Sequence, residues 1–98
     1  MPTHGAARTA TIRSLERREP FRRAGFAMHA LNGAASGTGR MPRDIAKVYE
    51  YDRHMITYTV LSYGTPIAWV LTDGTVKVPD VAYSRTTHGH QHLCRVHL

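Results

Sequence analysis

The chain has 98 residues, 42% of them hydrophobic, and its 13 basic residues outnumber 7 acidic ones to give a formal net charge of +6. This length supports one small domain and excludes separate cofactor and substrate domains. The single cysteine excludes an internal disulfide, and no apolar run approaches the ~18 residues of a membrane-spanning helix. We therefore expect a soluble protein of a reducing compartment, with a charge that suits negatively charged partners.

The first quarter of the chain carries most of the positive charge. Residues 1–25 contain six arginines against two glutamates, a net of +4, whereas residues 26–98 contribute +2. Residues 1–10 show no apolar pattern and no apolar core of a secretory signal. We expect them to form a flexible N-terminus.

Two short helices separated by a loop are predicted before the strands begin. Thr11 or Ser14 is expected to cap a helix that continues to Arg18, with apolar residues facing inward and arginines outward. Residues 24–40 are rich in Gly, Ala, Ser and Asn, which is typical of a loop. The apolar spacing then predicts a second helix at about 42–51.

From residue 54 the apolar spacing changes to two, which predicts strands. The Tyr-Gly-Thr-Pro sequence at residues 63–66 is a turn signal, and Asp-Gly at residues 73–74 is the strongest hairpin signal of the chain. The predicted fold class is α+β, with residues 11–98 as a single small domain. After the short N-terminal helices we expect a three-stranded antiparallel meander at about 54–63, 66–72 and 75–83, and a C-terminal helix at about 86–96.

The strand residues are expected to alternate between the two faces of the sheet. In the first strand Ile56, Tyr58 and Val60 should share one face, with the intervening residues on the other. The uninterrupted apolar run at residues 67–71 predicts a central strand. Within it we expect Trp69 to be a core residue rather than an exposed stacking surface.

The histidines near the end of the chain raise the question of a metal site. On a helix, His90, Cys94 and His97 fall on one face, and imidazole and thiolate are zinc ligands. Structural zinc sites usually take ligands from two elements, however, and His4 and His29 are isolated. We therefore interpret the histidines as surface residues and Cys94 as a small buried hydrophobe, and we expect no metal or cofactor.

Two patterns that suggest catalysis or phosphate binding are incomplete. The glycine-rich residues 32–40 lack the Gly-Lys-Ser/Thr sequence of a phosphate loop. Thr86, Thr87 and His90 lie close together at a helix start, but no acid nearby in the sequence would orient the imidazole. We therefore expect a protein that is not an enzyme.

The start of the C-terminal helix is a better candidate for binding. Its free backbone N–H groups and positive dipole end attract anions, and hydroxyl groups within residues 84–87 can cap it. Arg85 adds a guanidinium fork that fits phosphate oxygens. Tyr63 and Tyr83 would add stacking faces if they are exposed.

Four sequence blocks support a resemblance to known proteins. They are Pro-Phe at residues 20–21, Thr-Gly-Arg-Met-Pro at 38–42, Tyr-Gly-Thr-Pro-Ile-Ala-Trp at 63–69 and Tyr-Ser-Arg-Thr-Thr-His-Gly-His-Gln at 83–91. In order and spacing they resemble a family of small uncharacterised proteins of tailed bacteriophages, especially those that infect mycobacteria. The resemblance implies a phage origin and the cytoplasm of a bacterial host, and it assigns no activity.

The leading hypothesis is a non-enzymatic phage accessory protein that binds nucleic acid non-specifically through phosphate contacts. One alternative is a host-protein interaction module that modulates a bacterial target, and another is a minor virion or assembly component. No membrane partner is expected. The residues expected to contact nucleic acid are Arg85, Thr86, Thr87 and His90 at the last helix, with Arg13, Arg17, Arg18, Arg22 and Arg23.

Overall fold

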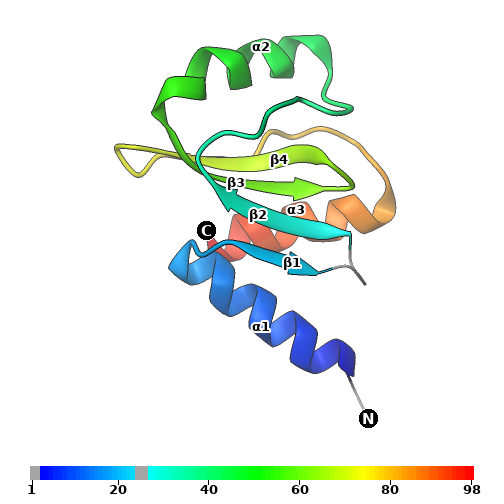
Figure 1. Cartoon of the computed structure of the whole chain (residues 1–98). Helices are drawn as coiled ribbons and strands as arrows, with labels where there is room; N and C mark the ends of the chain where they lie inside the picture. The colour runs from blue at the N-terminus through cyan, green and yellow to red at the C-terminus, as the bar shows by residue number, and fades with distance from the viewer. Residues whose placement is uncertain (1–2, 24–26) are drawn as a thin grey trace.

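The computed structural model describes residues 3–23 and 27–98 and shows an α+β fold, as the sequence predicted (Figure 1). A five-stranded antiparallel sheet has the strand order β1-β2-β3-β4-β5. The elements in chain order are α1 (Thr3–Arg17), β1 (Phe21–Arg23), β2 (Met28–Asn32), α2 (Arg43–Asp52), a 3-10 turn η2 (Arg53–Met55), β3 (Ile56–Ser62), β4 (Thr65–Leu71), β5 (Val76–Lys77) and α3 (Arg85–His97).

The predicted meander corresponds to β3, β4 and β5, but two further strands lie in the segment that we expected to contain no strand. β1 pairs with β2, and β2 pairs with β3 over its whole length. The sequence of β2, Met-His-Ala-Leu-Asn, contains no β-branched residue, which is why its propensity did not reveal it. The strand forms because the edge of β3 offers it a complete ladder of hydrogen bonds.

The first helix is longer than predicted. The expected start at Thr11 or Ser14 is wrong, since α1 begins at Thr3 and includes residues 3–10 of the segment that we expected to be flexible. Its end agrees with the prediction to within one residue. Arg18 has a φ of 54° and Glu19 N donates to Ser14 O, which are the marks of a Schellman stop.

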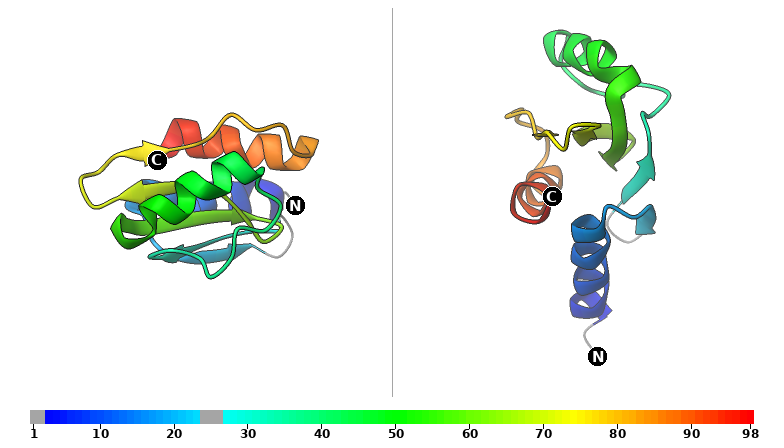
Figure 2. Two further views of the ribbon diagram at one scale, coloured as in Figure 1. Left: turned by 90° about the horizontal axis from the view of Figure 1, so that it is seen from above. Right: turned by 90° about the vertical axis from the view of Figure 1, so that its left-hand side faces the viewer.

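The sheet separates two layers of helix (Figure 2). α2 covers one face, and α1 and α3 cover the other. The C-terminal ends of α1 and α3 are tied together, because Arg18 Nη2 donates to Leu98 O at 2.9 Å and His97 Nδ1 lies 2.9 Å from Glu16 Oε2.

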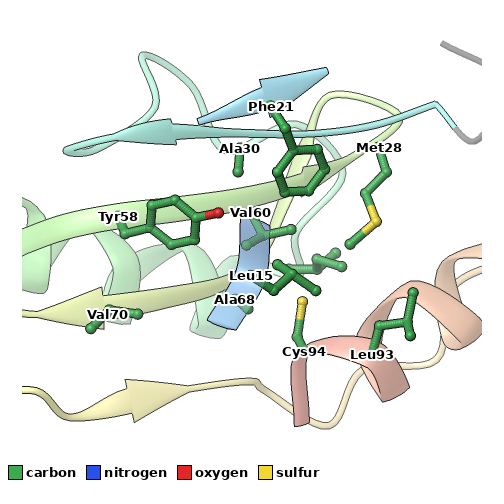
Figure 3. Packing of buried hydrophobic residues seen from close by; sticks show 11 residues of the cluster. Leu15, Phe21, Met28, Ala30, Tyr58, Val60, Ala68, Val70, Leu93 and Cys94 are labelled. Atoms are coloured by element: carbon green, nitrogen blue, oxygen red, sulfur yellow. The ribbon is translucent and has the colours of Figure 1, made fainter. Parts of the chain in front are cut away.

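The face beneath α1 and α3 is packed with apolar side chains (Figure 3). Leu15 of α1 is fully buried there against Leu93 and Cys94 of α3. Burial raises the pKa of the Cys94 thiol to about 12, as expected for a cysteine that acts as a small hydrophobe. The sheet contributes Phe21, Met28, Ala30, Tyr58, Val60, Ile67, Ala68 and Val70.

The face beneath α2 combines apolar packing with buried hydrogen bonds. Trp69 is fully buried, which confirms the prediction that it belongs to the core. Its Nε1 donates to Asp52 Oδ2 at 2.9 Å, and Lys77 Nζ donates to the same oxygen at 2.7 Å. Tyr49 packs edge-on against Trp69 and its hydroxyl accepts from Ala35 N at 2.7 Å. These bonds hold α2 and the preceding loop on the sheet.

Two irregularities in the pairing of β3 with β4 change the predicted alternation. The register skips Thr57 on β3 and Ile67 on β4, which places one extra residue in each strand. Tyr58 and Val60 share a face as predicted, but Ile56 packs on the opposite face, beneath α2. The expectation for Ile56 is wrong because a bulge reverses the side of every residue beyond it.

Candidate functional site

The hairpin turn between β3 and β4 carries an exposed aromatic side chain. Ser62 pairs with Thr65, so the loop consists of Tyr63 and Gly64, whose φ angles are 50° and 80°. Two consecutive positive φ angles define a type I′ turn, which favours Asn or Gly at its first position. Tyr63 N donates to Ala27 O at 2.8 Å, and the Tyr63 side chain is 56% exposed. The turn therefore presents Tyr63 to solvent at a cost in backbone strain.

The loop before α2 packs closely against this turn. Gly39 has a φ of 55°, and a Cβ built on it would lie 2.8 Å from Thr65 Cα and 2.9 Å from Gly64 O. The adjacent Arg40 N donates to Thr65 Oγ1 at 2.9 Å. Only glycine allows this approach, which brings Arg40 beside the β3–β4 turn.

The start of α3 reaches the same turn through a chain of hydroxyl groups. Ser84 caps the helix by accepting from Thr87 N at 3.2 Å, and its hydroxyl donates to Thr87 Oγ1 at 3.1 Å. Thr87 Oγ1 lies 2.9 Å from Ser62 Oγ, which in turn lies 2.7 Å from His90 Nδ1. Burial lowers the pKa of His90, so its neutral form is favoured and Nδ1 can accept the Ser62 hydrogen.

The Ser62–His90 pair has the contact between a hydroxyl and an imidazole that nucleophilic catalysis uses. Ser62 is nonetheless buried, and its oxygen is shared with Thr87. We interpret this chain of hydrogen bonds as the connection that fixes the start of α3 against the end of β3.

These three segments enclose a pocket of about 450 Å³, which we call the Arg40 pocket. The β3–β4 turn and the entry into α3 lie at the same end of the sheet (Figure 1), and residues from both line the pocket. Its walls are supplied by three of the sequence blocks described above, 38–42, 63–69 and 83–91, together with the segment before α3. The lining residues are Arg40, Pro42, Ser62, Tyr63, Thr65, Val81, Ala82, Tyr83, Ser84 and Thr87.

A second, smaller pocket of about 250 Å³ is also lined by Tyr63, and we call it the Arg22 pocket. It combines the end of β1 and the start of β2 with the β3–β4 turn. Tyr63 lines both pockets, and each pocket is also lined by at least one arginine. The lining residues are Arg22, Arg23, Ala27, Met28, His29, Tyr63 and Gly64.

The residues predicted to contact nucleic acid at α3 divide into two groups. Arg85 and Thr86 are exposed in the first turn of the helix. Thr87 and His90 are buried, and Thr87 Oγ1 and His90 Nδ1 both contact Ser62 Oγ. Arg85 and Thr86 can therefore meet a ligand at the surface, whereas Thr87 lines the Arg40 pocket and His90 lines neither pocket.

The predicted arginines of the N-terminal quarter are also divided. Arg22 and Arg23 lie at the Arg22 pocket, with the Arg23 guanidinium 5.2 Å from the centre of the Phe21 ring. Arg18 binds Leu98 O, at the end of α3 opposite Arg85. The 13 residues of α3 separate these two ends by roughly 20 Å at 1.5 Å per residue. Arg13 and Arg17 are exposed on α1, and no described contact joins them to either pocket.

The structure also separates the aromatic and histidine candidates. Tyr63 is exposed, and Tyr83 is half-buried with its pKa raised by burial. His88 and His92 are exposed on α3, whereas His97 contacts Glu16. In the described part of the chain, no group of three or more histidine, cysteine and acidic residues is placed to hold a metal ion.

Sequence reasoning missed Arg40 and the pocket that it lines. The available signal was the block at residues 38–42, which was recognised as part of the resemblance but was examined only as a phosphate loop. Its partner at the turn, Thr65, lies 25 residues further along the chain. The sequence contains nothing that brings these two residues together.

Comparison with known proteins gives the family of the chain. Among the helices of the described residues, none is long and apolar enough to cross a membrane. No curated protein and no solved structure matches the chain. The profile of a family described as a family of unknown function, DUF8033, matches residues 21–96, from β1 to the last turn of α3. The chain therefore belongs to the DUF8033 family, with α1 lying outside the matched region.

Proposed function

We propose that this protein binds single-stranded nucleic acid across the surface formed by Tyr63 and its two pockets. The observation that carries the proposal is that the exposed residue Tyr63 lines both pockets, one of which is also lined by Arg40 and the other by Arg22 and Arg23. An exposed aromatic ring combined with nearby cations is the arrangement with which proteins stack a base and hold the flanking phosphates.

The charge of this surface supports a polyanionic ligand. Arg22 and Arg40 are exposed, and Arg85 lies next to the pocket-lining residue Ser84. The pKa of His29, which lines the Arg22 pocket, is lowered first by burial and then by the positive charge of Arg22. A guanidinium group that already depresses a neighbouring pKa would favour a bound phosphate.

The conformation of Tyr63 supports the proposal independently of charge. A residue other than Gly, Asn or Asp in the left-handed region costs roughly 1–2 kcal/mol. Strain of this kind is commonly retained at sites that serve a purpose other than stability. A tyrosine where the turn favours asparagine is understandable if its ring contacts a ligand.

The biological setting that the sequence blocks imply completes the proposal. A bacteriophage protein acting in the cytoplasm of its bacterial host would meet replicating, transcribed and packaged nucleic acid. The binding that we propose depends on phosphate charge and stacking, so it would be only weakly selective for sequence.

The decisive measurement is the affinity for a labelled 20-nucleotide oligothymidylate at several salt concentrations. Replacing Arg22, Arg23 and Arg40 by glutamine should reduce the slope of log K against log salt by about 2, because each cation contributes roughly 0.7 on single strands. Tyr63→Asn should weaken binding by about tenfold through loss of stacking, with little change in the slope.

The matched control removes the same charge elsewhere. Arg17→Gln combined with Arg13→Gln and Lys47→Gln lowers the net charge by three without touching either pocket. This variant should keep the slope and most of the affinity. Equal losses of affinity in the two triple variants would show that binding depends only on the total charge of the protein. If the unmodified protein does not bind oligothymidylate at low salt, the proposal is refuted.

A protein partner is the second candidate, and an apolar stripe along α2 and η2 favours it. Val48, Tyr51 and Met55 are exposed at i, i+3 and i+7 spacing, and Tyr51 is 81% exposed. Capture from nuclease-treated host lysate separates the two candidates. A stoichiometric partner that is lost with Tyr51→Ser and retained with Tyr63→Asn would favour protein binding.

A further inference from the structure

We infer that the Arg40 pocket holds one unstacked nucleotide of the bound strand, with its base inside the pocket and its phosphate at Arg40. This inference rests on the proposed function and adds to it a specific place for a single base. The adjoining nucleotides would then continue past Tyr63 towards the Arg22 pocket.

Size separates the two pockets. Pockets that bind small molecules generally measure about 300–1,000 Å³. The Arg40 pocket, at about 450 Å³, lies within that range, whereas the Arg22 pocket, at about 250 Å³, lies below it. Only the first is large enough to enclose a ligand of nucleotide size, and the second is better suited to a backbone contact.

The chemistry of the lining fits the three parts of a nucleotide. Tyr63 and Tyr83 provide aromatic surface for a base, and Arg40 provides a cation for a phosphate. The Ser84 hydroxyl, which donates to Thr87, can still accept a hydrogen bond, and the Thr65 hydroxyl, which accepts from Arg40 N, can still donate one. A ribose or a base edge requires small polar contacts of this kind. A site for phosphate alone would not need the two tyrosines, and a site for an apolar ligand would not be lined with hydroxyl groups.

The pocket is fixed before any ligand arrives. Gln91, which is almost fully buried, donates from Nε2 to Val81 O at 3.1 Å and so holds the wall that precedes α3. On the opposite wall, the contact of Gly39 with the β3–β4 turn sets the position of Arg40. Binding would therefore require little ordering of the protein, which lowers its cost.

The test uses a substitution that fills the pocket and leaves every arginine in place. Ala82 is exposed and lines the Arg40 pocket, so Ala82→Trp should occupy the space without disturbing the core. Thr72→Trp introduces the same side chain at an exposed position after β4, remote from both pockets. The far-ultraviolet circular dichroism of each variant should match that of the unmodified protein.

The probes are AMP, CMP, GMP and UMP, measured by calorimetry and by amide chemical shifts in NMR, with inorganic phosphate as a separate ligand. At least one mononucleotide should bind and shift amides in residues 38–42, 62–65 and 81–87. Ala82→Trp should reduce that affinity at least tenfold, and Thr72→Trp should leave it unchanged. The affinity for oligothymidylate should fall about tenfold in Ala82→Trp with the same salt slope, since one enclosed base is lost while the phosphate contacts remain.

The remaining outcomes distinguish the pocket from the wider surface. If oligothymidylate binds the unmodified protein and Ala82→Trp equally and no mononucleotide binds, the inference is wrong and the proposed function stands. If inorganic phosphate shifts the same amides with the affinity of the mononucleotides, the pocket holds a phosphate and not a base. If mononucleotides bind the pocket but oligothymidylate binds no more tightly than they do, the Arg40 pocket is a nucleotide site. The proposal that a strand binds across the wider surface is then wrong.

Discussion

The turn between β3 and β4 and the turn between β4 and β5 are both hairpin loops, but their residues suit them unequally. After β4, Gly74 takes the positive φ of 89° and Asp73 Oδ1 accepts from Thr75 N at 2.9 Å. After β3, the positive φ angles fall on Tyr63 and Gly64, and the side chain of Tyr63 points into solvent. One turn is made of residues that favour its geometry. The other places a strained aromatic residue beside two pockets, which is the pattern expected when a ligand rather than the fold selects the residue.

Gly39→Ala should have the largest effect on stability, because Gly39 packs directly against the strained turn between β3 and β4. The substitution combines a left-handed alanine with overlap against Thr65 and the Gly64 backbone, so we expect a loss of about 3 kcal/mol in the free energy of unfolding. Urea denaturation measures it. Gly37→Ala is the control, since its new Cβ meets no atom within 4 Å and should change stability little.

Gly74→Ala tests the other turn and should cost less. The φ of 89° strains alanine as it does at Gly39, but no atom lies within 4 Å of the new Cβ. We expect a loss of about 1–2 kcal/mol from backbone strain alone. Urea denaturation of both variants gives the comparison, and equal losses at Gly39 and Gly74 would contradict a special role for the close approach of Gly39 to Thr65.

Tyr63→Asn should stabilise the protein while weakening ligand binding. Asparagine adopts the left-handed region more readily than tyrosine, so the free energy of unfolding should rise by about 0.5–1 kcal/mol. Thermal unfolding followed by circular dichroism would detect the change. A lower melting temperature would mean that the ring contributes more through its contact with His90, at 6.5 Å between centroids, than the backbone loses.

The stability contributed by the two ends of the sheet should also depend differently on pH. His90 lies near the β3–β4 turn at one end, and Asp73 lies in the β4–β5 turn at the other. Burial lowers the pKa of His90 below its ordinary value of 6.5, so below pH 6.5 the unfolded chain binds a proton that the folded chain does not. Stability should therefore fall as the pH decreases from 6.5 towards the folded pKa. Hydrogen bonds from Thr75 lower the pKa of Asp73 below 3.8, so its contribution persists down to that pH and is lost below it.

Urea denaturation between pH 7.5 and pH 3 tests this difference. His90→Gln should reduce the loss of stability near pH 6, and Asp73→Asn should leave that region unchanged. His29, whose pKa is also lowered, should account for part of the remaining slope. A denaturation midpoint that stays constant from pH 7.5 to pH 5 would contradict the acid response of this end of the sheet.

The sequence predicted the elements with a strong period and missed those formed by pairing alone. α2, α3 and the meander were recognisable from apolar spacing and turn residues, and Trp69 from its place in an apolar run. The third strand of the meander was expected at about 75–83, but β5 covers only Val76–Lys77. β2 was missed because its residues have no strand preference and depend on the edge of β3. The start of α1 was missed because residues 3–10 show no apolar face, although alanines within them favour helix.

The candidate site was less predictable than the fold. Local reasoning limited the cap to Ser84, Thr86 or Thr87, of which Ser84 is the one observed, and it found the turn at Gly64, because each depends on neighbouring residues. It did not find the Arg40 pocket, which depends on contacts between segments 25 residues apart. Burial of Thr87 and His90 was equally hidden, since only the packing of α3 against β3 determines it.

β1 is one of the two edge strands of the sheet, only three residues long, and two of those residues are Arg22 and Arg23. Short, charged border strands discourage copies of a protein from joining side by side into larger sheets. The guanidinium groups that we assign to phosphate would thus also keep the protein dispersed at high concentration. Selection for solubility and selection for ligand binding would then act on the same two residues, Arg22 and Arg23.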